Sequence, residues 1–336
     1  MDGKYENLTE EELQKKVERY SKVLSDAKKE IGKGVIGQKF MIELLLEALI
    51  ANGHVLLEGV PGIGKTFLIK VVSEIIGCSF SRIQFTPDLL PTDIVGVTTY
   101  EEGRGFFTLK GPIFANFVLG DEINRSPPKV QSALLEAMQE KQVTIGKETF
   151  NLPVPFFVMA TQNPIENLGT YKLPEAQLDR FLFKIIMTYP TIEEEELVIE
   201  NNMTLKKFDE FKLQTIMQDT DIEDIQKIVK QIKLDEKVRK YLVRLVDATR
   251  YPKKYNLELS SKYIEFGASP RASIALYIAS KAQALMNGRI YVTHKDIKDV
   301  APHIFRHRIL VNFEGQAENI TPDDLINEIL QKVPLI

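Results

Sequence analysis

The chain has 336 residues, of which 44% are apolar and 27% are charged, the balance of a folded globular protein and not of a disordered one. Its formal net charge of −4 does not indicate nucleic-acid binding by the protein as a whole, although it does not exclude a local basic patch. Cys78 is the only cysteine, which excludes an internal disulfide and favours a reducing, cytoplasmic setting. We expect no signal peptide and no membrane span, because no apolar run approaches the roughly twenty residues that a span requires.

The first 34 residues predict an amphipathic helix that packs on the domain after it. Residues 9–12, Thr-Glu-Glu-Glu, are typical of a capping box, and Gly32 and Gly34 are expected to stop the helix. A second helix is expected over residues 40–49. The apolar residues of the first helix recur at helical spacing: Leu13, Val17, Tyr20, Leu24, Ala27 and Ile31.

A glycine-rich stretch, residues 59–66, has the pattern G-x-x-x-x-G-K-T between a strand-like run and a helix-like run. Its glycines let backbone N–H groups converge on an anion, and the following helix adds the positive end of its dipole. Lys65 would reach the β- and γ-phosphates of a nucleoside triphosphate, and the Thr66 hydroxyl would ligate Mg²⁺. A chance glycine turn is the alternative, against which the order and context of eight positions argue. The predicted nucleotide-binding residues are Gly59, Pro61, Gly62, Ile63, Gly64, Lys65, Thr66 and Phe67.

Strand and helix patterns alternate from this loop to residue 187, which predicts an α/β fold with a parallel sheet wrapped by helices. A helix from Ser126 to Gln139 is expected to have Ser126 as its N-cap and Pro127 in its first position. Strands are expected at 82–85, 114–121, 154–160 and 183–187, and β-hairpins within 93–111 and at 143–150.

Composition changes after Tyr189-Pro190, and from there helix signals follow one another with little strand signal. We therefore divide the chain into an N-terminal helix (1–34), a nucleotide-binding α/β domain with two hairpin insertions (35–190) and a smaller helical domain (191–336). Helix starts in this last part are marked at Thr191, Asp221, Ser269, Thr293 and Thr321.

Polar residues follow two of the predicted strands. Asp121 and Glu122 come directly after the apolar run 117–120, where Asp121 would stand beside the bound Mg²⁺ and Glu122 would polarise a water for attack on the γ-phosphate. An exposed acidic pair is the alternative, but the phosphate loop upstream favours the functional interpretation. Asn163, at the tip of another strand, could hold the attacking water, unless it is simply a turn-forming Asn-Pro.

Blocks of sequence around these motifs indicate a family. They are residues 82–91 (RIQFTPDLLP), 121–125 (DEINR), 127–131 (PPKVQ), 160–164 (ATQNP) and 173–181 (LPEAQLDRF). Together with the phosphate loop they resemble the MoxR family of AAA+ ATPases, over nearly the whole chain. Two departures, Gly120 and Lys172, touch no reacting group.

The resemblance implies a AAA+ nucleotide-binding domain followed by an all-α lid domain, and it implies roles for particular residues. Asn163 would be the sensor 1 residue, and the segment 35–38, with Ile36 and Gly37, would lie against the adenine. Arg180 would be an arginine finger that acts on nucleotide held by the next subunit, although without the family an ion pair with Asp179 or Glu175 would be preferred. Arg271 would be sensor 2; it falls in the first turn of a helix, where the dipole disfavours a cation.

The resemblance also implies Mg²⁺-dependent ATP hydrolysis in a ring, expected to be a hexamer, that remodels or matures other proteins. A partner with a von Willebrand factor A domain is common in such systems, while the client stays unnamed by the sequence. A nucleic-acid motor is the second interpretation, with Arg104, Lys110, Lys141 and Lys147 of the hairpins lining a pore; a phosphotransferase is the third. His303 and His307 have a metal-ligand spacing, but Arg306 and Arg308 beside them favour a basic helix end.

Overall fold

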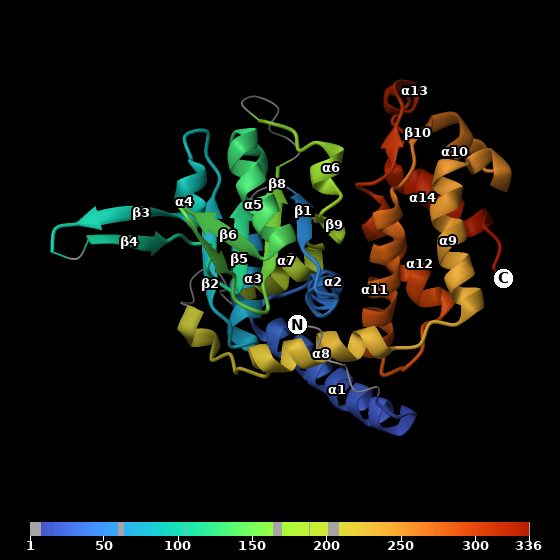
Figure 1. Cartoon of the computed structure of the whole chain (residues 1–336). Coiled ribbons are helices and arrows are strands. Elements are labelled where there is room, and N and C mark those ends of the chain that lie inside the picture. Colours follow the sequence, from blue (N-terminus) through green and yellow to red (C-terminus); the bar gives the residue numbers. More distant parts are fainter. Residues whose placement is uncertain are drawn as a thin grey trace. The chain divides into compact units, whose positions relative to one another are not determined.

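The computed structural model describes residues 8–59, 64–103, 105–163, 170–187, 189–200 and 208–335. The chain divides into two compact units (Figure 1). The sheet unit comprises Asp26–Glu223, and the helical unit joins Met1–Ser25 with Asp224–Ile336. None of the helices in the described part combines the length and the apolar composition needed to span a bilayer.

Five parallel strands form the sheet of the sheet unit, which confirms the predicted fold class. The three inner strands are largely buried and nearly continuous in apolar residues, as expected where helices cover both faces of a parallel sheet. In these inner strands polar residues appear only near the carboxyl ends. In spatial order the strands are β2 (Phe80–Gln84), β5 (Phe117–Asp121), β8 (Phe157–Gln162), β1 (Val55–Gly59) and β9 (Phe183–Met187).

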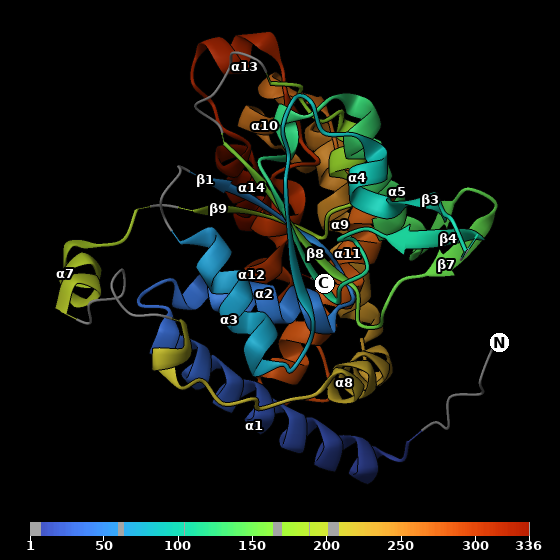
Figure 2. The same cartoon turned by 90° about the vertical axis from the view of Figure 1, so that its left-hand side faces the viewer.

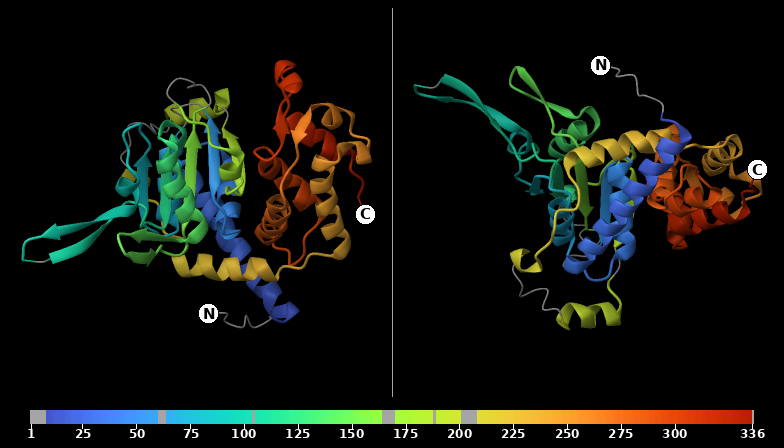
Figure 3. Two further views of the ribbon diagram at one scale, coloured as in Figure 1. Left: turned by 45° about the horizontal axis from the view of Figure 1, so that its top comes forward. Right: turned by 90° about the horizontal axis from the view of Figure 1, so that it is seen from below.

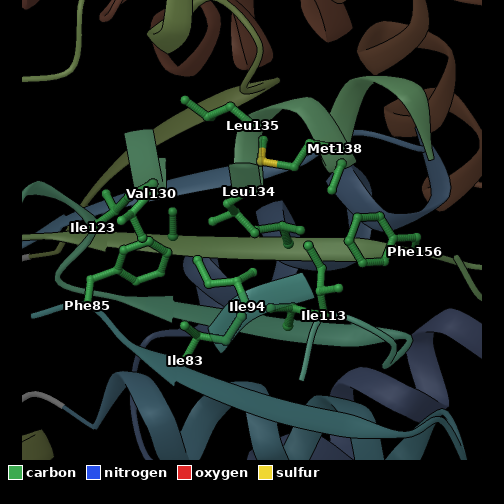
Figure 4. Close-up of a cluster of buried hydrophobic side chains, with 14 of the residues drawn as sticks. Ile83, Phe85, Ile94, Ile113, Ile123, Val130, Leu134, Leu135, Met138 and Phe156 are labelled. Carbon is green, nitrogen blue, oxygen red and sulfur yellow. The ribbon is translucent and has the colours of Figure 1, made fainter. Parts of the chain in front are cut away.

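Helix α5 (Pro128–Glu140) covers one face of the sheet, and Figure 4 shows Leu134 and Met138 reaching toward the strands. Figure 2 shows α2 (Lys39–Ile50) and α3 (Lys65–Ile75) together near the strands. The core cluster under α5 contains Ile83, Phe85, Ile94, Ile113, Ile123, Val130, Leu134, Leu135, Met138 and Phe156 among others. The shorter helices of this unit are α4 (Pro91–Val95), η1 (Ile123–Arg125), α6 (Glu175–Leu178), α7 (Ile192–Glu200) and η2 (Phe208–Phe211).

The predicted start of α5 was wrong by one residue. Pro127 is the N-cap and Pro128 takes the first helical position, because the 3₁₀ turn η1 ends at Ser126. The Ser126 hydroxyl is fully buried and donates to the Ile123 carbonyl at 3.3 Å instead of capping the helix.

Both predicted hairpins are confirmed (Figure 3). The first pairs β3 (Gly96–Glu101) with β4 (Gly105–Lys110), and the second pairs β6 (Gln142–Ile145) with β7 (Glu148–Asn151). Gly96 starts the first hairpin with φ 108°, and a Cβ there would lie 2.2 Å from the Leu109 carbonyl oxygen, so only glycine fits. Arg104, predicted for the tip, lies outside the described residues.

The helical unit confirms the start signals at Ser269, Thr293 and Thr321, whose side chains each accept a hydrogen bond from the first turn of their helix. One helix starts at Asp219, two residues before the predicted Asp221. The helices are α8 (Asp219–Gln231), α9 (Glu236–Arg250), η3 (Pro252–Tyr255), α10 (Glu258–Tyr263), α11 (Pro270–Met286), α12 (His294–Phe305), α13 (Phe313–Ala317) and α14 (Pro322–Lys332). A small antiparallel pair, β10 (Ile264–Phe266) with β11 (Leu310–Val311), was not predicted.

Helix α1 (Glu10–Gly34) has its six predicted apolar positions buried. Its first part belongs to the helical unit and its last part, from Asp26, to the sheet unit.

A buried histidine, His54, ties three parts of the sheet unit together just before β1. Its Nδ1 accepts from the Val158 backbone N–H at 3.0 Å, so the ring is neutral and Nε2 donates to the Met138 carbonyl at 3.2 Å. Burial, together with the positive charge of Lys141, lowers the pKa of His54 to about 3.

This neutral histidine predicts that the sheet unit loses stability in acid. An unfolded histidine titrates near pH 6.5 and the folded one near 3, so its stabilisation is complete above 6.5 and is lost as the pH falls toward 3. The slope is about 1.4 kcal/mol per pH unit. Denaturant unfolding between pH 7 and 4.5 should therefore show a shallower pH slope for His54→Asn than for the wild type. The pKa of His303 is also lowered, to about 4, but both proteins contain this residue, so its contribution to the pH slope is the same in each. Equal slopes would contradict the assignment.

Candidate functional site

The carboxyl ends of the parallel strands bring the predicted site residues to one edge of the sheet. Glu58 of β1 is in register with Gln162 of β8, and Gln84 of β2 with Asp121 of β5. In open α/β sheets this edge is where ligands bind.

The described ends of the phosphate loop have the geometry that anion binding needs. Gly64 is the N-cap of α3 with φ 79°, a left-handed conformation that glycine adopts without strain. Lys65 Nζ donates to the Gly59 carbonyl at 2.6 Å and so joins the two ends of the loop. Pro61, Gly62 and Ile63 lie outside the described residues.

Lys65 is surrounded by carboxylates at this edge. Burial lowers the pKa of Lys65, while the negative charges of Asp121, Glu122 and Glu58 oppose that shift. Glu58 also forms an ion pair with Lys184 at 2.6 Å. The other two acids are paired as well, Asp121 with Arg82 and Glu122 with Arg125.

Thr161, near the end of β8, connects the two acidic residues. Its hydroxyl donates to Asp121 Oδ1 at 2.7 Å and accepts from the Glu122 backbone N–H at 2.8 Å. The other oxygen, Oδ2, accepts from Arg82 Nη2 at 2.6 Å. Thr161 was not among the residues predicted for the site. The signal that could have indicated it was its place in the strand next to Asp121.

Glu122 has a backbone that few glutamates adopt. Its φ of 57° and ψ of 48° lie in the left-handed region, which costs a non-glycine residue about 1–2 kcal/mol. The carboxylate is held by Gln84 Nε2 at 2.9 Å and Arg125 Nη1 at 2.8 Å, both on Oε2. This conformation turns Glu122 out of the strand direction while Asp121 stays in line with it.

Of the residues expected to act on the phosphates, Asn163 is buried directly after β8. Arg180 follows α6, and its Nε is buried with no hydrogen-bond acceptor among the described residues. Arg271 belongs to the helical unit, where its backbone N–H donates to the Ser269 side chain at 3.1 Å.

The segment 35–38 follows Gly34, which lies beside α3. A Cβ on Gly34 would come within 3.2 Å of Val71 and 3.7 Å of Phe67. Gly37 has φ 69°, and the carboxylate of Glu194 in α7 occupies the space where its Cβ would be. Phe67 itself packs against Phe211, with ring centroids 5.3 Å apart. Gly34 is therefore a neighbour of the phosphate-loop helix, and Gly37 is a neighbour of α7.

The oxygen ligands present suit Mg²⁺. Thr66 lies in the first turn of α3, which contacts β5, the strand that ends in Asp121. Within the described ranges no group of three His, Cys, Asp or Glu side chains could hold a metal by itself, which includes His303 and His307. Mg²⁺ at a nucleotide takes one or two protein oxygens and fills its remaining positions with phosphate oxygens and water, so a hydroxyl and a carboxylate fit it.

Comparisons with known proteins agree with these features. Residues 54–183 match the family described as "ATPase family associated with various cellular activities (AAA)", and residues 257–329 match the "AAA lid domain". The chain is 46% identical to "Chaperone MoxR1" of Mycobacterium tuberculosis, over 91% of this chain and 80% of that one. It is 30% identical to "Protein MoxR" of Methylorubrum extorquens, over 91% and 93%. The crystal structure of a candidate ATPase from Cytophaga hutchinsonii superposes with a TM-score of 0.90 at 47% identity, over 96% and 97% of the two chains. The phosphate loop, the acidic pair after β5 and the helical C-terminal part are thus those of a protein family, and the chain belongs to the MoxR family of AAA+ ATPases.

Proposed function

We propose that this chain hydrolyses ATP with Mg²⁺ and uses the conformational cycle to remodel partner proteins. One observation carries the proposal: the Thr161 hydroxyl bonds the Asp121 carboxylate and the Glu122 backbone N–H, so the two acids stand in different settings beside Lys65. Asp121 ends the strand, while the left-handed backbone of Glu122 turns that residue away from it. Two acids with separate tasks are what phosphoryl transfer to water needs.

Different residues of this chain would bind the phosphates, hold the metal ion and accept the proton of the attacking water. Lys65 binds the β- and γ-phosphates, exchanging the Gly59 carbonyl for phosphate oxygens. Thr66 and Asp121 would hold Mg²⁺, which when bound neutralises charge on the phosphates. Glu122 accepts the proton of the attacking water through Oε1, since its bonds to Gln84 and Arg125 both use Oε2.

Three further residues complete the proposed site. Asn163 would orient the water from the end of β8. Arg180 would reach the nucleotide of the next subunit in a ring, and a hexamer is the form that the family suggests. Arg271 would act as sensor 2, and Ile36 with Gly37 would hold the adenine. Arginine suits these roles because it stays charged and forks around phosphate oxygens.

The β3–β4 hairpin favours a protein as the client. Tyr100 and Phe106 are 61% and 79% exposed and pack on each other with ring centroids 5.1 Å apart. Glu101 beside them would repel a phosphate backbone. Lys110, which the nucleic-acid interpretation needs, lies over the ring of Phe114 at 4.8 Å. A partner with a von Willebrand factor A domain stays part of the proposal, and the relative named as a chaperone is in keeping with it.

Substitution of Lys65 and of Glu122 should separate binding from hydrolysis. Lys65→Ala should lose tight ATP binding because the phosphates lose their main point charge. Glu122→Gln should bind ATP normally and fail to hydrolyse it, since the carboxylate serves the water. Fluorescent-nucleotide titration and phosphate release measure the two steps, with Lys70→Ala on the same helix as a control. Equal loss of binding in both variants would make Glu122 structural.

Arg180 can be tested by mixing subunits. Arg180→Ala should bind ATP but hydrolyse it roughly 10³–10⁵-fold more slowly, the contribution of an arginine finger. Mixed with Glu122→Gln, it should regain activity, because some interfaces then contain both intact groups. Lys172→Ala, an exposed cation of the same segment, is the matched control and should be active alone. No recovery in rings shown to be mixed would remove Arg180 from the neighbouring site.

The hairpin should be needed for client engagement and not for hydrolysis. Tyr100→Ser with Phe106→Ser should leave the basal ATPase rate nearly unchanged, since neither side chain reaches the sheet edge. Proteins retained by a Glu122→Gln trap should be lost when the trap also carries these two changes. Phe313→Ser, an 85% exposed aromatic of the helical unit, is the control. Unaltered retention would exclude the hairpin as the contact surface.

A further inference from the structure

Gln131, in the first turn of α5, is a fully buried polar side chain with an unusual set of partners. Its Nε2 lies 3.2 Å from the carbonyl oxygen of Ile123, 3.1 Å from that of Ser126 and 3.2 Å from that of Tyr171. The Tyr171 N–H in turn donates to the Asn124 carbonyl at 2.7 Å. One side-chain amide therefore joins two segments that lie far apart in the sequence, one around Ile123 and Ser126 and the other at Tyr171.

The orientation of this amide follows from its surroundings. Three carbonyl oxygens face Nε2, so a flipped amide would point its own oxygen at three acceptors. With the amide as it is, Oε1 is buried and finds no hydrogen-bond donor among the described residues. Within the described residues, the hydrogen bonds of this side chain are thus made by its donors, and they go to backbone carbonyls.

The two segments that Gln131 joins contain residues with different proposed roles. The first, residues 122–126, begins with Glu122. The second, residues 171–180, ends with Arg180. Both segments also enter the same apolar cluster, the first through Ile123 and the second through Leu173, with Phe181 just beyond it. Figure 4 shows Ile123 beside Val130 of α5, the residue that precedes Gln131 in the chain. Because the Gln131 amide contacts both segments, a displacement of the first segment can be transmitted through it to the second.

We propose that Gln131 is a positioning residue that couples the Glu122 loop to the Arg180 segment of the same chain. This rests on the proposed function, in which Glu122 serves the subunit's own nucleotide and Arg180 serves the neighbour's. A shift of the loop when nucleotide binds moves the carbonyls of Ile123 and Ser126. Gln131 passes that shift to Tyr171 and so to the arginine. Nucleotide binding in one subunit then determines how that subunit positions Arg180 at the nucleotide of the next subunit.

Hydrogen exchange measures this coupling within a single chain. In the Glu122→Gln background, ATP should change the exchange of backbone amides in 171–181 by roughly fivefold or more, the lower end of common coupling factors. Adding Gln131→Met, which keeps the side-chain volume but has no donor, should abolish that change. Protection of residues 64–66 by ATP should persist, because those residues bind the phosphates directly. Gln177→Met is the matched control, since Gln177 has its Oε1 buried without a partner among the described residues and does not join the two segments.

Steady-state kinetics give a second readout that simple loss of packing would not produce. Gln131→Met should lower kcat with little change in the KM for ATP. In mixed rings it should complement Glu122→Gln, which supplies an intact Arg180 segment, and it should fail to complement Arg180→Ala. The Gln177→Met control should complement either one as the wild type does.

The outcomes separate this proposal from the proposed function. Unchanged exchange at 171–181 on ATP binding with Gln131 intact overturns the coupling, and this holds even where Gln131→Met fails to fold. An exchange change that survives Gln131→Met overturns the role of Gln131 itself. Failure of Glu122→Gln and Arg180→Ala to complement each other would instead overturn the neighbouring role of Arg180, with the exchange experiment still deciding the coupling.

Discussion

The hydroxyl of Thr161 is the contact on which the rest of the site depends. It can donate only one hydrogen, which goes to Asp121, and it accepts one, from the Glu122 backbone. The bond joins β8 to the end of β5 and fixes two consecutive residues in two directions. Without it, Asp121 would lose the donor on Oδ1, and the backbone N–H of Glu122 would lose the acceptor that supports its left-handed conformation.

The sheet explains why such a small contact suffices. Four of the five residues of β5 are fully buried, and its neighbours β2 and β8 are paired to it along their length. Buried strands packed at the density of a crystal leave little room for displacement. The polar residues at the strand ends are therefore attached to a rigid backbone, and one or two hydrogen bonds are enough to fix each side chain.

Local signals in the sequence were enough to predict the phosphate loop, the acidic pair, both hairpins and most helix starts. These features depend on glycine conformations, capping residues and apolar periodicity, all of which act within a few positions. The partners of Glu122 that are distant in the sequence could not be predicted in the same way. Gln84 lies 38 positions away from it and Thr161 lies 39, so they meet only once strand order and register are known. The β10–β11 pair escaped prediction because two or three residues cannot show an alternating pattern.

The left-handed backbone of Glu122 places function and stability in conflict at one position. Glycine would adopt φ 57° without the steric cost, and asparagine would bear it better than glutamate does. A population of variants selected in the laboratory only for heat resistance would therefore drift toward these residues at position 122. Under the role proposed for Glu122, such a drift would yield more stable proteins that bind the nucleotide and no longer hydrolyse it. Selection for heat resistance alone would then remove the proposed activity while it stabilised the fold.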